Sequence, residues 1–289
     1  MLLSMTGFGE ARRQDDRWAV SVEVRSVNNR HLKLNAKLGD RYSALEPDLE
    51  RLVRETLRRG TVQLTLRVDR PRKTEDYRLN TVALASYRAQ LQEVFGQDVS
   101  LQGLLQLPGV VEERRSNQDD PHEEWPELAE IVSEALAKLQ ASRAEEGRSM
   151  ADELTALGDS IVGRLEVIAA RAPLVVEGYQ KRLEERVRTL LEGKGATLQP
   201  GDLIREVSIF AERADIAEEV VRLRAHLGQF RAVIDEPESA GRKLEFVVQE
   251  MGRETNTIGS KANDLEISRE VVEIKGALEK IRELIQNVE

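Results

Sequence analysis

The chain has 289 residues, no cysteine, 4% aromatic residues and a formal net charge of −9. The absence of cysteine excludes disulfides, zinc–thiolate sites and thiol catalysis. No run of about 18 apolar residues occurs, as a membrane-spanning helix would require, and the first residues lack the basic and then apolar pattern of a signal peptide. We therefore expect a cytoplasmic protein with no membrane partner, long enough for two or more domains.

Charge is distributed unevenly along the chain. Residues 1–75 contain 16 Lys and Arg and 11 Asp and Glu, whereas residues 76–289 contain 27 and 41. A basic first part beside an acidic remainder fits a phosphate-binding surface joined to a metal-binding or scaffolding part. It fits an ordinary protein with an acidic helical arm equally well, because the basic excess is well below that of a dedicated nucleic-acid-binding domain.

The first 116 residues show the patterns of a small α/β domain. Apolar and polar residues alternate over 18–27, 32–38 and 61–68, which predicts half-buried strands. Helical spacing of apolar residues predicts helices over 44–59 and 81–95. Together these elements predict a domain over residues 1–116 with a mainly antiparallel sheet.

From about residue 117 the composition changes to Ala, Leu, Glu and Arg at helical spacing. The pattern predicts a long helical hairpin or arm over 117–195, with a candidate break at 171–173, where a proline lies. Further helices are predicted over 203–236, 240–256 and 265–288, after a loop at 193–201. They form a predicted C-terminal helical domain over 196–289, so the predicted fold class is α+β.

Charged residues recur on a helical period in the helix predicted over 203–236. Glu212, Asp215, Glu219, Arg222 and His226 follow one another at three or four residues, which places all five on one stripe of one helix. Because hard divalent cations prefer oxygen ligands, the first three could hold one metal ion. His226 lies too far along for that ion and could transfer a proton. The structural alternative is a solvated face whose Glu–Arg pairs contribute roughly 0.2–0.5 kcal/mol each.

A second predicted helix carries Glu250 and Glu254 one turn apart, with Arg253 beside them. Two helices that bear carboxylates and face each other could hold metal ions over a scissile phosphate. Lys243, Arg253 and Lys261 would then contact the phosphate backbone. In the structural alternative, Arg253 is a salt-bridge partner and Lys261 is a loop residue near a helix C-terminus.

Two neighbouring residues have a simpler interpretation. Residues 263–266 show the Asn-x-x-Glu pattern of a capping box, so we assign Asn263 and Asp264 to helix capping instead of catalysis.

Basic and polar residues also gather at a predicted strand end over 25–33, where Arg25 and Arg30 lie. The low aromatic content argues against an aromatic base-stacking platform, so RNA contact here would depend on phosphates and shape. No Walker loop, G-x-G-x-x-G or G-x-S-x-G motif occurs, which argues against NTPase, Rossmann and α/β-hydrolase functions.

Several segments are more specific than these patterns. They are Ser-Met-Thr-Gly-Phe-Gly at 4–9, Glu-Val-Arg-Ser-Val-Asn-Asn-Arg at 23–30, the acidic run at 212–219, Arg-Leu-Arg-Ala-His at 222–226 and the block at 241–264. Together they resemble the YicC-like (YicC/YloC) family of bacterial endoribonucleases over essentially the full length, least over about 115–195. The resemblance implies a cytoplasmic endoribonuclease that needs a divalent metal, Mg²⁺ or Mn²⁺. It also implies a ring-like homo-oligomer, a hexamer, with other RNA-decay enzymes as further candidate partners.

On this resemblance we expect His226, Glu250 and Glu254 to be catalytic and Glu212, Asp215 and Glu219 to bind the metal. The candidates for RNA contact are Arg25, Arg30, Lys243, Arg253 and Lys261. Two cleavage routes stay open: attack by a metal-bound hydroxide, and activation of the RNA 2′-hydroxyl by His226. Two other functions stay open as well, a non-catalytic RNA-binding adaptor that delivers RNA to another ribonuclease and a scaffold that binds neither metal nor RNA.

Overall fold

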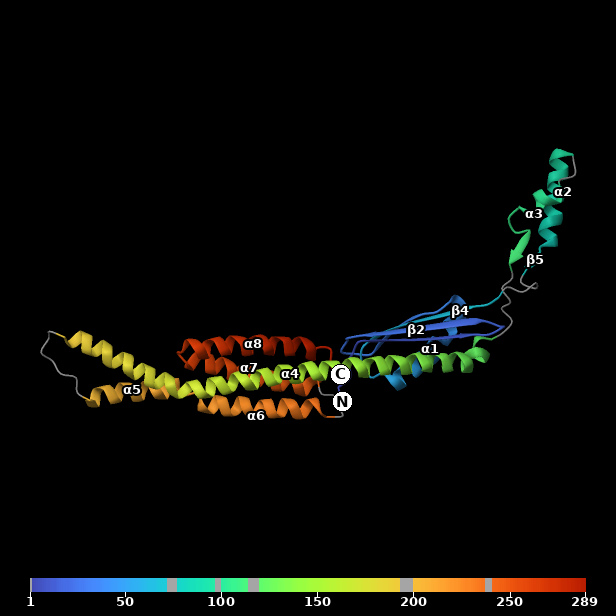
Figure 1. The fold of residues 1–289 in the computed structure, drawn as a ribbon. Coiled ribbons are helices and arrows are strands. Elements are labelled where there is room, and N and C mark those ends of the chain that lie inside the picture. Colours follow the sequence, from blue (N-terminus) through green and yellow to red (C-terminus); the bar gives the residue numbers. More distant parts are fainter. Residues whose placement is uncertain (1, 72–76, 97–99, 114–119, 193–199, 237–240) are drawn as a thin grey trace. The chain divides into compact units, whose positions relative to one another are not determined.

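The structure, a computed structural model, describes residues 2–71, 77–96, 100–113, 120–192, 200–236 and 241–289. The chain forms two compact units (Figure 1). The sheet unit comprises residues 8–25 and 31–139, and the bundle unit comprises residues 1–7, 26–30 and 140–289. This division differs from the predicted segments 1–116, 117–195 and 196–289, because the long helix α4, Pro121–Leu191, contributes to both units.

The sheet unit contains a four-stranded sheet in the order β1-β2-β4-β3. Its strands are β1 Gly7–Gln14, β2 Ala19–Val27, β3 Lys33–Lys37 and β4 Thr61–Asp69. Strand β3 runs parallel to β4, with Lys33 opposite Thr61, and the stretch between them forms a 3-10 turn at Asp40–Leu45 and helix α1, Glu46–Thr56. The strands predicted over 18–27, 32–38 and 61–68 and the predicted sheet character are confirmed.

Alternation along the strands places one face of the sheet in the core. The buried apolar side chains of β2 and β4 are valines and leucines that meet Leu49 and Val53 of α1 and the α4 residues Leu128 and Ile131. Strand β1 approaches α4 so closely that a Cβ on Gly9 would lie 2.1 Å from the Ala135 carbonyl oxygen. Glycine is therefore required at this position of the 4–9 motif.

The described residues between 77 and 113 form two short strands and two helices. Strands β5 Tyr77–Leu79 and β6 Val111–Glu113 pair antiparallel, and helices α2 Thr81–Phe95 and α3 Leu101–Leu105 lie between them in the chain. Asn80 caps α2 by accepting a hydrogen bond from the Ala83 N–H, and Gly96 ends it in the left-handed region at φ 66°. The helix predicted over 81–95 is confirmed.

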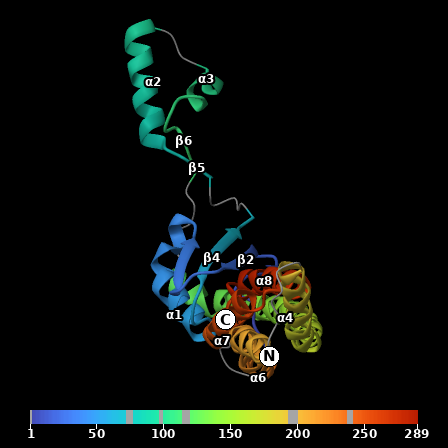
Figure 2. The same ribbon diagram turned by 90° about the vertical axis from the view of Figure 1, so that its left-hand side faces the viewer.

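The bundle unit is helical. Figures 1 and 2 show α4 side by side with α6 Ala217–Ile234, α7 Gly241–Lys261 and α8 Leu265–Ile285. Their apolar stripes meet in one core that includes Leu165, Leu223, Phe230, Met251 and Ile274. The predicted α+β class is confirmed. Among the described residues, no helix is both long and apolar enough to cross a membrane.

Two predicted helix boundaries are wrong. Helix α4 continues through Pro173, because buried Ile168 and Val175 hold the turns on both sides of it in the core. The helix predicted over 203–236 is two helices, α5 Pro200–Ala214 and α6. It breaks at Asp215, whose carboxylate Oδ1 accepts a hydrogen bond from the Ala217 N–H at 2.9 Å and so competes with helix continuation. The predicted loop at 193–201 lies mostly outside the described residues.

The two ends of the chain meet in the bundle unit, in what we call the terminal clasp: Ser4, Met5, Arg143 and Glu289. The Met5 N–H donates to the Asn287 carbonyl at 2.8 Å, and the Glu289 N–H donates to the Leu3 carbonyl at 2.9 Å. The Arg143 side chain, only 1% exposed, donates from Nε to the Ser4 carbonyl at 2.6 Å and pairs with the Glu289 carboxylate. Part of the 4–9 motif is therefore structural.

Candidate functional site

Helices α6 and α7 pack antiparallel, since residues at the start of α6 meet the end of α7 and residues at the end of α6 meet its start. We call the line where they meet the α6–α7 seam, and define it by Glu219, Arg222, His226, Glu250, Glu254 and Lys261. Five of these six are predicted site residues, and the pairs that join the two helices are Glu219 with Lys261 and Arg222 with Glu254.

One end of the seam is an ion pair whose carboxylate is buried and whose lysine is partly exposed. Lys261 Nζ lies 2.7 Å from Oε1 of Glu219, whose residue is 5% exposed. The hydrogen bond to Glu219 raises the pKa of Lys261 against the opposing effect of desolvation, and the nearby charges of Asp215 and Glu218 add to the rise. The other oxygen of Glu219, Oε2, is buried without a hydrogen-bond partner among the described residues. A buried carboxylate oxygen that lacks a partner is costly, so the site is incomplete as it stands.

The next level of the seam pairs Arg222 of α6 with Glu254 of α7. Their closest nitrogen and oxygen are 4.0 Å apart, and Arg222 also pairs with Glu218 one turn earlier. Glu254 is 9% exposed, so its carboxylate is held close to the protein interior beside a cation. Such an arrangement keeps a guanidinium within reach of a bound anion.

His226 and Glu250 occupy the following level, one turn beyond Arg222 on α6 and one turn before Glu254 on α7. His226 is half-buried, with Nδ1 3.3 Å from the Gln229 side-chain oxygen. Glu250 accepts two hydrogen bonds from Arg253 Nη1, at 3.0 and 3.1 Å. Arg253 therefore has the salt-bridge partner that the structural alternative predicts, and this partner lies in the same helix.

The predicted metal ligands do not share one helical stripe, because the break at Asp215 separates Glu212 on α5 from Glu219 on α6. Glu212 is exposed, whereas Asp215 lies close enough to Lys261 to influence its pKa. Within the described ranges, no group of three or more His, Asp or Glu side chains is arranged to hold a metal ion. The side chains of one chain therefore do not form the predicted three-carboxylate site.

The predicted RNA contacts lie in both units. In the sheet unit the Arg25 guanidinium stacks over the Phe8 ring at 5.3 Å, and in the bundle unit Arg30 is exposed. Lys243 pairs with Glu236, and Arg253 is exposed beyond its pair with Glu250. Each of these cations except Lys261 is largely open to solvent, as phosphate contacts require.

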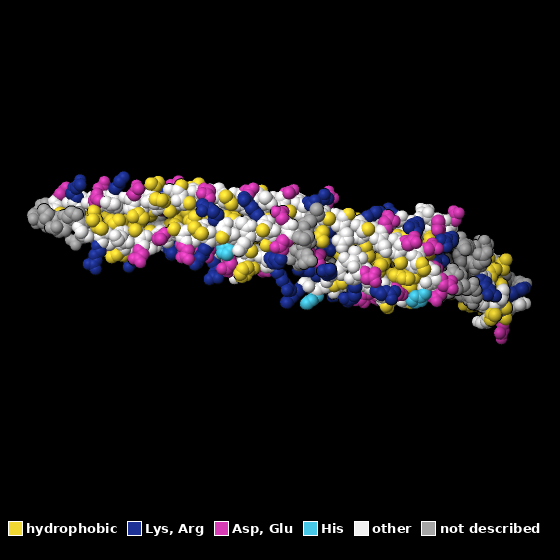
Figure 3. Space-filling view, turned by 90° about the horizontal axis from the view of Figure 1, so that it is seen from below, with side chains coloured by type: hydrophobic (Ala, Val, Ile, Leu, Met, Phe, Trp, Pro, Cys, Tyr) yellow, Lys and Arg dark blue, Asp and Glu magenta, His cyan; other side chains and the backbone are white. Residues whose placement is uncertain are grey.

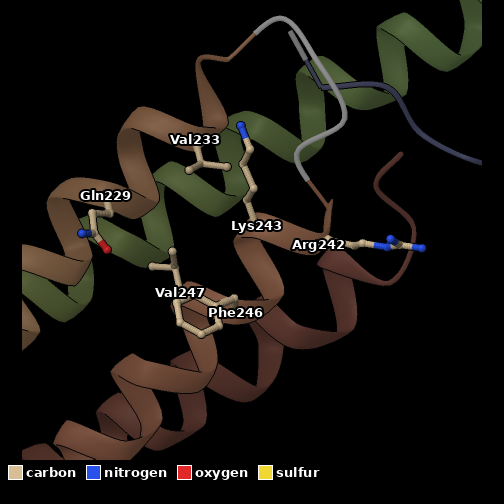
Figure 4. Close-up of a pocket in the computed structure, with 6 residues that line it drawn as sticks. All are labelled: Gln229, Val233, Arg242, Lys243, Phe246 and Val247. Atoms are coloured by element: carbon tan, nitrogen blue, oxygen red, sulfur yellow. The ribbon is translucent and has the colours of Figure 1, made fainter.

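Sequence reasoning missed residues at the open end of the seam. A hollow of about 410 Å³ is lined by Gln229, Val233, Arg242, Lys243, Phe246 and Val247 (Figure 4). The sequence signal for this hollow is Phe246, an exposed aromatic residue on α7 that lies three residues after the cation pair Arg242 and Lys243. Periodicity alone does not identify such a residue, because any helix tolerates single exposed apolar side chains.

The fold and the seam together define an α+β protein with a helical bundle that presents paired charges and one histidine. Its sequence matches two family models: residues 2–152 match the one described as endoribonuclease YicC-like, N-terminal region, and residues 168–289 match endoribonuclease YicC-like, C-terminal. It is 37% identical over 296 residues to a protein of Clostridioides difficile (strain 630) named probable endoribonuclease YicC. It is 30% identical over 295 residues to a protein of Haemophilus influenzae that bears the same name.

Both alignments cover 100% of this chain and 100% of the relative. The chain therefore belongs to the YicC-like family, as its motifs predict.

Proposed function

We propose that this chain is an endoribonuclease that cleaves RNA at internal phosphodiester bonds, with its active site on the α6–α7 seam. Its membership of a family named for that activity, over the full length, carries the proposal. The seam supports it, because carboxylates, a histidine and cations together provide proton transfer and charge stabilisation for a phosphodiester.

The proposed roles follow from the levels of the seam. His226 and Glu250 exchange protons with the attacking and leaving oxygens, and Glu254 orients the guanidinium of Arg222 beside them. Lys261 and Arg222 stabilise the negative charge that grows on the phosphate. The remaining predicted cations, Arg25, Arg30, Lys243 and Arg253, contact other phosphates of the strand.

We also propose dependence on a divalent cation, Mg²⁺ or Mn²⁺. The described side chains of one chain do not supply three ligands for it, and the predicted trio of Glu212, Asp215 and Glu219 is split by the break between α5 and α6. RNA phosphate oxygens or a second copy of the chain would have to complete the ligand set, as is common for Mg²⁺.

The proposal includes a cytoplasmic, ring-like homo-oligomer, a hexamer, which acts with other RNA-decay enzymes as candidate partners. Exposed apolar side chains support self-association: Leu174 and Leu190 on α4 and Ile204 and Ile209 on α5. Figure 3 shows hydrophobic side chains gathered over this part of the molecule, at the left of the view. Apolar surface of this kind commonly marks an interface.

A second candidate function is a non-catalytic RNA-binding adaptor that delivers RNA to another ribonuclease. One observation favours it: Glu219 and Glu254 each face a cation of the same chain, as structural carboxylates do. In that case the seam would hold RNA by its cations alone.

The test is cleavage of a structured RNA by the purified chain with Mg²⁺, with Mn²⁺ and with EDTA, beside the variant Glu250→Gln. We expect internal cuts that EDTA abolishes and that Glu250→Gln slows by about 10²–10⁴-fold, as expected for loss of a proton-transfer group. Glu245→Gln is the matched control, because Glu245 is exposed on the same helix outside the seam. Intact RNA that still binds would overturn the endoribonuclease in favour of the adaptor.

The ends of the products separate the two cleavage routes. If His226 accepts the proton of the 2′-hydroxyl, the 2′-oxygen displaces the 5′-oxygen and the upstream fragment ends in a 2′,3′-cyclic phosphate. If water attacks, no cyclic phosphate forms.

A further inference from the structure

The hollow at the open end of the seam has an aromatic wall exposed to solvent. Phe246 is 63% exposed on α7, and Val233 and Val247 form an apolar floor beside it (Figure 4). The volume of about 410 Å³ lies within the roughly 300–1,000 Å³ of ligand pockets. An apolar floor beside an exposed ring suits a flat ligand that stacks.

Lys243 and Gln229 lie beside this apolar floor, and Arg242 lies at its edge with its side chain directed away from the other five (Figure 4). Arg242 and Lys243 come from the first turn of α7, and Gln229 comes from α6 (Figure 4). Lys243 pairs with Glu236, whereas the structure shows no partner for Arg242 among the residues it describes. An unpaired guanidinium beside an apolar hollow is complementary to a ligand that is flat at one end and anionic at the other.

A nucleotide has this combination of features. Its base has a π-face that stacks on an aromatic ring whatever the base, and its edge offers donors and acceptors to an amide such as that of Gln229. Its phosphate is an anion that a guanidinium binds through two parallel hydrogen bonds.

The position of the hollow along the seam agrees with this ligand. Gln229 lies three residues after His226 on α6, and Phe246 lies four residues before Glu250 on α7. Residues at these spacings are neighbours on a helix surface. A base on Phe246 would therefore place the adjoining phosphate one helical turn away, at the level of His226 and Glu250.

We propose that this hollow, the Phe246 pocket, binds one unpaired nucleotide of single-stranded RNA next to the bond that is cut. The base stacks on Phe246, Gln229 contacts its edge and Arg242 binds the phosphate. This proposal rests on the endoribonuclease function and names its substrate class: RNA that is single-stranded at the cleavage site. A single exposed ring suffices, and no platform of several aromatic residues is needed.

The experiment measures binding of a short single-stranded RNA that carries 2-aminopurine. Phosphorothioate linkages and 2′-O-methyl riboses keep this probe intact by either cleavage route. With the full wild-type chain we expect quenching of 2-aminopurine fluorescence, which reports stacking. Phe246→Ala removes the quenching and weakens binding about 5- to 140-fold, as expected for one lost base–aromatic stack. Phe246→Trp retains both signals.

Two further variants sharpen the result. Arg242→Ala lowers the slope of log affinity against log salt by about 0.7, as one lost phosphate contact on a single strand predicts. Phe95→Ala is the matched control, because Phe95 is an equally exposed phenylalanine at 67% on α2. Loss of quenching or affinity in Phe95→Ala equal to that in Phe246→Ala overturns the pocket.

The outcomes also separate this proposal from the function on which it rests. Cleavage with unchanged probe binding in Phe246→Ala overturns the pocket and leaves the endoribonuclease standing. Quenching at Phe246 without cleavage of any RNA overturns the endoribonuclease and leaves a nucleotide-binding pocket. A fall in subunit number in Phe246→Ala, measured by sedimentation, assigns the face to a second copy of the chain and overturns the pocket.

Discussion

The bundle unit holds two nearly buried charged sites that are built in opposite ways. In the terminal clasp, Arg143 has the Ser4 carbonyl and the Glu289 carboxylate as partners, and neighbouring backbone groups pair with one another. At the α6–α7 seam, Glu219 has one oxygen on Lys261 and the other without a partner among the described residues. The buried arginine of the clasp therefore has partners at both ends of its guanidinium, whereas the buried glutamate of the seam has a partner, within the described part of the chain, for only one of its two oxygens.

The difference separates a charge whose buried partners all belong to the chain from a carboxylate that has one buried oxygen without a partner among the described residues. A buried charge stabilises or specifies a structure only when its hydrogen bonds are satisfied, as those of the clasp are. An unsatisfied buried oxygen costs stability, and such local cost is typical of functional sites. The comparison therefore predicts a large loss of stability when one partner is removed at the clasp, and little loss when both partners are replaced at the seam.

The largest expected effect is at the clasp. Arg143→Met leaves the Glu289 carboxylate and the buried Ser4 carbonyl without their partner, so we expect a loss of about 3–5 kcal/mol in the free energy of unfolding. Urea unfolding followed by circular dichroism measures it. Arg148→Met is the control, because Arg148 is exposed on the same helix, and its effect should stay within about 0.5 kcal/mol. Equal losses in both variants would contradict the structural role of the clasp.

At the seam, replacement of both partners by apolar residues should cost little. The double variant Glu219→Leu/Lys261→Met replaces an ion pair and an unpartnered oxygen by apolar groups of similar size, which is often neutral or stabilising. We expect an unfolding free energy no lower than that of the wild type, together with loss of RNA cleavage. A destabilisation as large as that of Arg143→Met would show that the seam is a second structural clasp.

The elements with strong periodicity could be predicted, and those that depend on a single hydrogen bond or on tertiary packing could not. Strand β4 and helix α8 follow from alternation and helical spacing alone. The break before α6 depends on the Asp215 carboxylate, in a stretch whose apolar stripe continues past it. Likewise, Pro173 predicts a break that core packing on both sides of it prevents.

For the site, residue types were predictable and their partners were not. Carboxylates and His226 stand out by their spacing, but periodicity does not say which face of α6 meets α7. The structure therefore brings Glu219 to Lys261 and Arg222 to Glu254, whereas the predicted stripe joined Glu219 to Glu212. Phe246 was missed because an exposed aromatic residue is recognisable only when its surroundings are known.

A third variant tests a carboxylate that has its partners but lies at a helix end, where we expect a smaller loss of stability than at the clasp. Asp264 is the N-cap of α8, where Oδ1 accepts from the Glu266 and Ile267 N–H groups, and Arg171 pairs with it at 3.1 Å. Asp264→Ala should lower the unfolding free energy by about 1 kcal/mol, as for other lost N-caps. Asn263→Ala is the control, because Asn263 is exposed and the cap belongs to its neighbour.

The pH dependence of that loss identifies its origin. Burial would raise the pKa of Asp264, but the hydrogen bonds from Arg171 and the two backbone N–H groups outweigh it and hold the pKa below its usual value of 3.8. A carboxyl group whose pKa is lower in the folded state stabilises the fold above its unfolded pKa, and this contribution disappears as pH falls through the folded pKa. The stability difference between wild type and Asp264→Ala should therefore be full at neutral pH and shrink below about pH 3.8. A difference that stays constant well below pH 3.8 would mean that Asp264 acts through packing and not through its charge.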